Sequence, residues 1–329
     1  MNILTGKLIV KSAPHILTPR TTQKIMLDVL IALCPAVIAA TWLFGLRSLL
    51  LIVVSVASCL LFEFLFARLC KRPSNIGDLS AVVTGVLLAL NIPVQLPLYI
   101  LFFGAFVAIV ISKQFFGGIG KNFSNPAITA RVAMVISFAK PMSQWAVTGG
   151  GGFLDGMSSA TPLALMKSGG LLDGVSSATA MKVSMPSSSS LFFGTHLGSL
   201  GETCALALLL GGVYLIVRRV ITLAIPVSFL GTVAVIALLA GKNPLQHLLT
   251  GGVLLGAIFM ATDYVTSPTT EKGKCIYGFG CGFITMAIRL FATFPEGVSF
   301  AILLMNLLSP HLDRITRTKP FGGETNASK

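Results

Sequence analysis

The sequence predicts an all-α polytopic membrane protein with about ten transmembrane helices, arranged as two inverted five-helix repeats that contain broken or half-helices. Hydrophobic residues make up 54% of the 329 positions and charged residues only 11%, whereas about a quarter of a soluble chain is charged. Long apolar runs alternate with polar segments, and the basic residues gather at the ends of those runs. The net charge of +13 is therefore not the mark of a nucleic-acid-binding face.

The membrane spans are predicted from the apolar runs, because a helix needs roughly 20 apolar residues to cross the bilayer core and fewer where it is broken. The predicted spans are 25–45, 48–70, 78–92, 97–113, 126–139, 203–218, 221–241, 246–262, 275–293 and 296–312. The third, fifth and tenth are short, which indicates half-helices or tilted segments. The chain thus divides into an N-terminal segment (1–24), a first membrane half (25–139), a loop (140–202), a second membrane half (203–312) and a tail (313–329).

Two polar segments interrupt the apolar pattern at corresponding places in the two halves. They are "GGIGKNFSNPA" at Gly117–Ala127 and "ATDYVTSP" at Ala261–Pro268. Backbone groups of such segments would be left without partners in lipid, so each segment must be buried in protein or line a cavity. We therefore expect both interruptions to lie in the protein interior.

The distribution of Lys and Arg orients the chain. With alternating spans, most of the 24 basic residues fall on the side of the N-terminus. The opposite side holds only Arg47, Lys140, Lys167, Lys182 and Lys242, while Arg131 and Arg289 lie within spans. Cytoplasmic segments are the basic ones. We therefore expect a multi-pass protein of the cell membrane (inner or plasma membrane), with both termini cytoplasmic and loop 140–202 extracytoplasmic.

A weak internal repeat supports the division into halves. "GDLSAVVTG" at 77–85 aligns with "NPLQHLLTG" at 243–251, sharing Leu, Thr and Gly. Because each half has an odd number of spans, the second half would be inverted relative to the first. Such architectures bind or conduct their substrate at the interface between the halves.

The loop 140–202 carries the phrase D-G-x-S-S-A-T twice, ending at Thr161 and Thr179. Pro162 keeps Thr161 out of helical geometry and favours a helix immediately afterwards. A threonine just before a helix N-terminus is well placed to carry a phosphate, since free N–H groups and the helix dipole stabilise an anion there. The alternative interpretation is a low-complexity linker that duplicated by slippage.

Ionisable side chains in or near the spans are candidates for function, because burying a charge in hydrocarbon is costly. These are Asp28, Glu63, Arg131, Asp263, Arg289 and Glu296. We expect structural pairing for Asp28 and Glu296, whereas Glu63 and Asp263 suit either role. The residues that we consider candidates for an ion path are Glu63, Asp263, Thr266, Arg131 and Asn125. No catalytic residue and no metal ligand is assigned, because the histidines and cysteines are scattered.

Several segments together resemble one known family. They are "SAPHI" before the first span, "MLDVLIALCPA" at its start, "GKNFSNPAITAR" at 120–131, "SSATPLALMK" at 158–167, "GSLGETCALALLLGG" at 198–212 and "ATDYVTSPTTEKGKCIYG" at 261–278. On these segments the chain resembles the RnfD/NqrB family, the membrane subunits of the Rnf ion-translocating electron-transport complex and of the sodium-pumping NADH:quinone reductase.

This resemblance implies a cofactor and its anchor. In that family a flavin transferase, working outside the cytoplasm, esterifies the phosphate of FMN to the threonine that corresponds to Thr161. Asp155, Ser158 and Ala160 would be recognised by the transferase, and Ser159 belongs to the same cofactor-binding phrase. Thr179 is the alternative anchor. Similarity to NqrB further implies a second, non-covalent flavin (riboflavin).

The resemblance also implies the function. The chain would relay electrons through covalent FMN between ferredoxin and NAD and couple this transfer to Na⁺ or H⁺ translocation. It would be a subunit of a translocating oxidoreductase, incomplete as an enzyme alone, with the other Rnf-type subunits, a flavin transferase and the lipid bilayer as partners. The alternative is a stand-alone inverted-repeat channel or secondary transporter without a redox cofactor.

Overall fold

The computed structural model describes residues 21–71, 76–144, 163, 187–194, 198–202, 204–292 and 296–317. In this part of the chain all regular secondary structure is helical, and no β-strand occurs. Three helices are long and apolar enough to cross a membrane: α1 (Thr22–Phe44), α2 (Leu46–Leu69) and α13 (Glu271–Phe291). The predicted class of an all-helical membrane protein agrees with these features.

The first half of the chain continues with shorter elements. These are the 3₁₀ turn η1 (Ile76–Asp78), α3 (Ser80–Leu90), α4 (Leu98–Phe106), the π-helix η2 (Val107–Gln114), α5 (Pro126–Ser137) and α6 (Ala139–Met142). α1 ends at Gly45, whose φ of 73° turns the chain directly into α2. α5 begins where it does because the Asn125 side chain caps the N–H groups of Ala127 and Ile128, and Pro126 occupies the first helical position.

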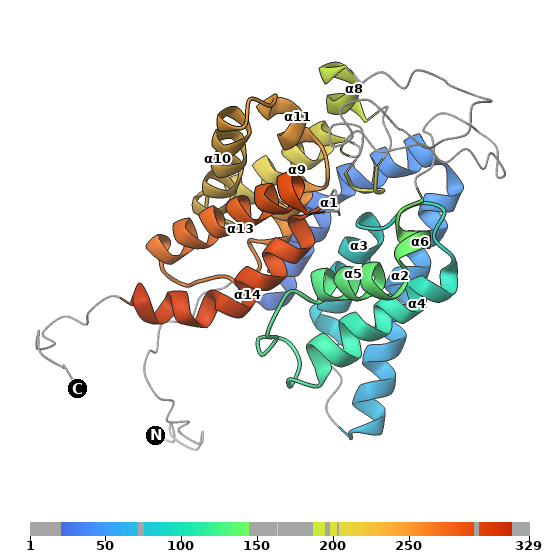
Figure 1. Ribbon diagram of the computed structural model, residues 1–329. Helices are drawn as coiled ribbons and strands as arrows, with labels where there is room; N and C mark the ends of the chain where they lie inside the picture. The colour runs from blue at the N-terminus through green and yellow to red at the C-terminus, as the bar shows by residue number, and fades with distance from the viewer. Residues whose placement is uncertain are drawn as a thin grey trace, which may run out of the picture.

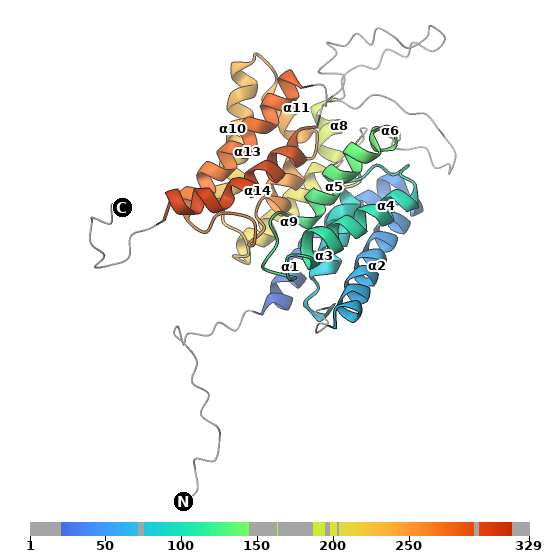
Figure 2. The ribbon, with the colours of Figure 1, turned by 60° about the horizontal axis from the view of Figure 1, so that its bottom comes forward.

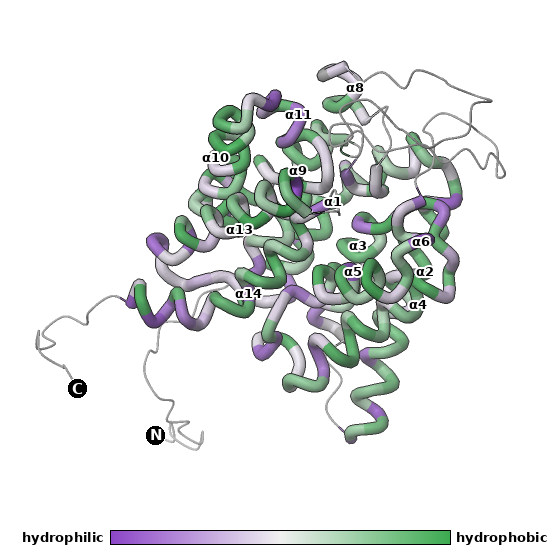
Figure 3. Tube along the Cα trace, viewed as in Figure 1, coloured by the Kyte–Doolittle hydropathy of each residue, from purple (hydrophilic) through white to green (hydrophobic). Residues whose placement is uncertain are grey.

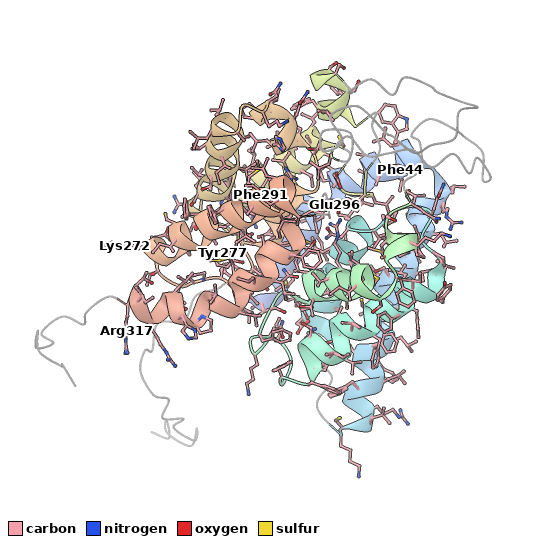
Figure 4. All side chains as sticks on the ribbon, viewed as in Figure 1. Phe44, Lys272, Tyr277, Phe291, Glu296 and Arg317 are labelled. Atoms are coloured by element: carbon pink, nitrogen blue, oxygen red, sulfur yellow. The ribbon has the colours of Figure 1, made fainter. Side chains whose placement is uncertain are left out.

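The second half is built from a similar set of elements. After α8 (Ser188–Phe193) come α9 (Ala205–Val217), α10 (Ala224–Leu239), α11 (Pro244–Leu249), α12 (Val253–Leu255), the π-helix η3 (Gly256–Met260), α13 and α14 (Val298–Ile315). α13 and α14 are antiparallel neighbours. Figure 4 shows Lys272 and Arg317 at one end of this helix pair and Phe291 and Glu296 at the other.

Helices occupy all the predicted spans, and α14 continues past the apolar run of the tenth through Pro310 and Asp313 to Ile315. One span differs from the prediction. The eighth span is split into α11, α12 and η3, and the split falls at Gly251 and Gly252, which have φ values of 71° and 68°. The first polar interruption, 117–127, is non-helical until α5 begins at Pro126. The second, 261–268, is non-helical throughout, and α13 begins after it at Glu271.

The two halves lie side by side. In Figures 1 and 2, α2 to α6 form one group and α10, α11, α13 and α14 form another, with α1 and α9 packed together between them. A second contact between the halves joins α5 to α14. In Figure 3 most of the helical tube is hydrophobic, and the hydrophilic residues gather at helix ends and connections. Large apolar side chains such as Trp42 and Phe291 are exposed on the outside, as expected for a surface that faces lipid.

The contact between α1 and α9 depends on a small residue. Gly211 of α9 lies directly against the main chain of α1, so that an added Cβ atom would collide with the Ala32 carbonyl oxygen and would lie 2.9 Å from the Phe259 ring. Such close approach of helix backbones is typical of helix packing in membranes.

We therefore expect Gly211→Val to separate α1 from α9. Overpacking of this kind costs about 1–3 kcal/mol or more, which should lower the midpoint of thermal unfolding of the detergent-solubilised protein. Gly231→Val in α10 is the matched control, because nothing lies within 4 Å of a Cβ atom at that position. Equal midpoints for the two variants would show that the two helices do not need this contact.

Candidate functional site

A pocket lies between the two halves, at the end of the molecule where α3 and α5 begin. We call it the interface pocket. Its apolar walls include Leu87 of α3, Leu215 of α9 and Phe259 of η3. Its polar lining residues are Ser80, Thr84, Lys113, Asn122, Asn125, Thr262 and Asp263. Apolar walls with a few convergent polar groups are typical of a binding site for an organic molecule.

Both polar interruptions contribute to this pocket. The first supplies Asn122 and Asn125, and the second supplies Thr262 and Asp263. The structure thus places the parts of these segments around Asn125 and Thr266 in the protein interior, whereas Gly117, Gly120, Lys121 and Tyr264 are exposed, so the expectation holds for only part of each segment. Two segments that are far apart in the sequence thus line one pocket.

The two asparagines present amide groups to the pocket in different ways. Asn125 caps α5 with its oxygen, while its Nδ2 donates to the Met260 carbonyl across the interface, 3.2 Å away. Asn122 Oδ1 is buried and has no hydrogen-bond partner in the described part of the chain. A buried acceptor without a partner is costly. A pocket occupant with an N–H group would satisfy it.

Asp263 is held by the segment that contains it. Its carboxylate accepts from the Thr266 hydroxyl at 3.2 Å and from the Val265 N–H at 3.5 Å. Burial raises the pKa of the Asp263 carboxyl, and these two hydrogen bonds oppose the shift. Asp263 and Thr266, two of the ion-path candidates, are therefore in direct contact, and Asp263 lines the pocket.

Glu63 does not reach the pocket itself but pairs with a residue that does. Lys113 Nζ donates to Glu63 Oε1 and to Ser80 Oγ, each at 2.6 Å. The side chains of Glu63 and Lys113 are only 1% and 2% exposed. Gln114 Nε2 donates to the same Glu63 oxygen at 2.9 Å. A buried ion pair thus stands immediately behind one wall of the pocket.

Arg131 of α5 forms polar contacts with Asn91, at the end of α3, and with Glu296, just before α14. Its Nη1 donates to Asn91 Oδ1 at 2.6 Å, and its Nη2 forms an ion pair with Glu296. Asn91 Nδ2 lies 3.3 Å from the sulfur of Met260, the residue whose carbonyl accepts from Asn125. Polar contacts therefore run across the interface from the pocket to Glu296.

Arg289 and Glu202 stabilise the break between α11 and α12. Arg289 donates to the carbonyl oxygens of His247 and Thr250 at 2.6 and 2.7 Å, and Glu202 Oε1 accepts from the Gly251 N–H at 2.6 Å. Broken helices are tolerated at membrane depth only when the freed backbone groups find such partners. These two buried charges therefore have a structural role, and Leu163 is buried beside Gly251 and Arg289.

Of the remaining ionisable candidates, Asp28 accepts from Tyr214 and pairs with Arg218 across the α1–α9 contact. The predicted flavin-binding positions Asp155, Ser158, Ser159, Ala160, Thr161 and Thr179 lie outside the described residues. Their roles stay predictions.

Sequence reasoning missed several polar residues of the site, among them Asn91, Lys113, Asn122 and Glu202. Hydropathy ends the fourth span at Lys113 and so places this lysine at a cytoplasmic helix end. A lysine inside an otherwise apolar segment, with a glutamate inside a neighbouring span, was the available signal for a buried pair. For Asn91 and Glu202 the sequence offers only polar residues at the ends of apolar runs, which is also the pattern of ordinary helix ends.

Together, these features define a polytopic helical membrane protein in which paired charges and amides are buried between two halves. The chain belongs to the NQR2, RnfD, RnfE family, whose family model matches residues 9–322.

Curated relatives cover nearly the whole chain. The D subunit of the Na(+)-translocating ferredoxin:NAD(+) oxidoreductase complex of Acetobacterium woodii is 45% identical over 96% of this chain and 95% of its own length. The D subunit of the proton-translocating ferredoxin:NAD(+) oxidoreductase complex of Clostridium ljungdahlii is 37% identical over 95% of this chain and 96% of its own length. The D subunit of an ion-translocating oxidoreductase complex of Stutzerimonas stutzeri is 38% identical over 92% of each chain.

Proposed function

We propose that this chain is the D subunit of an Rnf-type membrane complex, which passes electrons between ferredoxin and NAD and couples their transfer to Na⁺ or H⁺ translocation. The observation that carries the proposal is the match of 45% identity along 96% of the chain to a protein of that name. The other subunits of such a complex are its partners. The names of two relatives give sodium for one and protons for the other, so similarity does not fix the coupling ion.

The proposal includes FMN bound covalently through its phosphate to Thr161, with Thr179 as the alternative anchor, and attached by a flavin transferase. The phrase that ends at Thr161 and is followed by Pro162 supports this assignment. Leu163, two residues further on, is buried beside Arg289.

A second, non-covalent flavin fits the chemistry of the interface pocket. The polar edge of an isoalloxazine ring carries one N–H donor between two carbonyl acceptors. Asn122 Oδ1 is a buried acceptor that lacks a donor, and Lys113 lines the same pocket as a donor. Leu87 and Phe259 provide apolar surface for the ring faces. When bound, such a ring accepts and releases electrons, while these residues would hold and orient it.

The ten-helix inverted repeat is supported by the pattern of packing. In the first half α2 packs against α3 and α4, and in the second half α10 packs against α11 and α13. The fourth and fifth spans of each half are also in contact: α5 packs on η2 in the first half, and α14 packs on α13 in the second. The contacts between halves pair α1 with α9 and α5 with α14, which are the corresponding helices of the two repeats. We propose the orientation with cytoplasmic termini in the cell membrane, from the distribution of Lys and Arg.

The ion-path candidates fall into two groups at this interface. Glu63, Asp263, Thr266 and Asn125 lie in or behind the pocket, and Arg131 lies between Asn91 and Glu296. We propose that ion movement is linked to the first group. The guanidinium of Arg131 repels cations, and its contacts with Asn91 and Glu296 position neighbouring groups.

Inside-out vesicles from the source organism test the function. Reduced ferredoxin should drive both NAD reduction and ion uptake in vesicles that contain this chain, and both should be lost when the chain is deleted and return on complementation. Ion flux by the chain alone in liposomes, without an electron donor, would contradict the proposal and favour the stand-alone channel or transporter.

A further inference from the structure

The ion pair of Glu63 and Lys113 has features that packing alone does not explain. Two ions from α2 and η2 are almost fully buried, and Glu63 Oε2 has no hydrogen-bond partner in the described part of the chain. Such pairs are often no more stabilising than apolar residues of similar size. Lys113 also lies in a π-helix, a geometry found frequently at functional sites.

A chain of hydrogen bonds joins this pair to the surface. Lys113 Nζ donates to Ser80 Oγ, and Ser80 Oγ donates to Asp78 Oδ1, both at 2.6 Å. Asp78 is partly exposed at the start of α3. The order Asp78, Ser80, Lys113, Glu63 thus leads from solvent to a buried carboxylate through side chains joined by hydrogen bonds.

Lys113 and Ser80, two members of this series of hydrogen bonds, line the interface pocket. An ammonium group has three N–H donors, and Glu63 and Ser80 use two of them. The third can donate to an acceptor atom of a molecule in the pocket, which Lys113 and Ser80 both line. Other titratable groups close to Glu63 and Lys113 are Cys59 on α2, Asp78 on η1 and Asp263 across the pocket.

We infer that Lys113 positions the polar edge of the pocket's flavin, and that Glu63 is the buried group that takes up a proton when negative charge is added to the pocket. This inference rests on the proposed second flavin. With the ring bound, an electron from the reduced donor of the complex would add one negative charge beside Lys113. One proton enters from water at Asp78, and Lys113 passes a proton to Glu63 as it receives one from Ser80, which is reprotonated from Asp78.

The charge balance explains the arrangement. Lys113 is again an ammonium once the proton has moved, and the net charge of the buried region is restored, so that the added charge is not left uncompensated in a region of low dielectric constant. The transferred ion at this point is a proton, because the route from Asp78 to Glu63 consists of hydrogen-bonded side-chain atoms.

The test is a redox titration of the non-covalent flavin in the purified complex, between pH 6 and 9, in a Thr161→Val background that removes the covalent flavin. We expect the midpoint potential of this flavin to fall with rising pH. The slope of the midpoint potential against pH should at least halve in Glu63→Gln. Lys113→Met should weaken retention of added riboflavin by about tenfold or more, since it removes a charge-assisted hydrogen bond. Lys121→Met, at an exposed lysine outside the pocket lining, should change neither quantity.

The double variant Glu63→Gln/Lys113→Met keeps the test decisive if one single variant does not fold, because it leaves no unpaired buried charge. It should bind riboflavin weakly and show the flattened slope. Unchanged slope and riboflavin affinity in all variants would overturn the inference while leaving the flavin site intact. Absence of any non-covalent flavin in the parent would overturn the flavin site and this inference together, a result easily told apart from the first.

Discussion

Replacing Thr161 by valine is expected to abolish the covalent flavin of this chain. Valine has nearly the shape of threonine but lacks the hydroxyl oxygen that would form the phosphoester, so the fold should be unaffected while attachment fails completely. The measurement is in-gel flavin fluorescence of the denatured protein, expressed together with its flavin transferase. The signal of the wild type should disappear in Thr161→Val.

Thr179→Val is the matched control, because it removes the same hydroxyl from the second copy of the phrase. Its fluorescence should equal that of the wild type. A signal that survives in Thr161→Val and disappears in Thr179→Val would move the anchor to Thr179. No signal in the wild type, with a transferase that modifies a control protein, would remove covalent flavin from the account.

Breaking the ion pair of Arg131 and Glu296 is expected to cause the largest loss of stability. Arg131 is 4% exposed and Glu296 20% exposed. Removing one partner of a buried pair leaves the other charge without compensation, at a cost of about 3–5 kcal/mol. Arg131→Leu should therefore lower the thermal unfolding midpoint strongly, and adding Glu296→Leu should recover most of the loss because no charge then remains unpaired.

The pair of Lys274 and Glu271 provides the comparison. Its glutamate is 65% exposed, and pairs at exposed sites contribute about 0–1 kcal/mol. Glu271→Gln should therefore leave the midpoint almost unchanged. If Arg131→Leu lowers the thermal unfolding midpoint no more than Glu271→Gln does, the stability of the interface does not depend on its buried charges.

Much of the architecture could be predicted from the sequence because lipid imposes strong rules. The apolar runs predicted the helices, and the segments around Asn125 and Asp263 were predicted to be interior because their backbone groups need partners that lipid cannot supply. The break at Gly251 was not predicted. Its backbone groups are satisfied by Glu202 and Arg289, which are distant in sequence, and no local pattern reveals such partners.

The candidate site was only partly predictable, for the same reason. Glu63 and Arg131 were found because a charge inside an apolar run is conspicuous. Lys113 and Asn91 were missed, and Glu296 was expected to pair without its partner being identified, since the three residues are 50, 40 and 165 positions from their partners and are brought to them only by the fold. The order of polar contacts from the pocket to Glu296 is a property of the tertiary structure alone.

The most direct test of the account is the partition of flavin after denaturation of the purified complex. Acid precipitation should leave covalent FMN with this chain in the pellet and release the flavin of the interface pocket into the supernatant. In Lys113→Met the released fraction should fall while the pellet fraction is unchanged. The account would be contradicted by a complex that translocates ions although no flavin is attached to this chain, and whose Lys113→Met variant releases as much flavin into the supernatant as the parent.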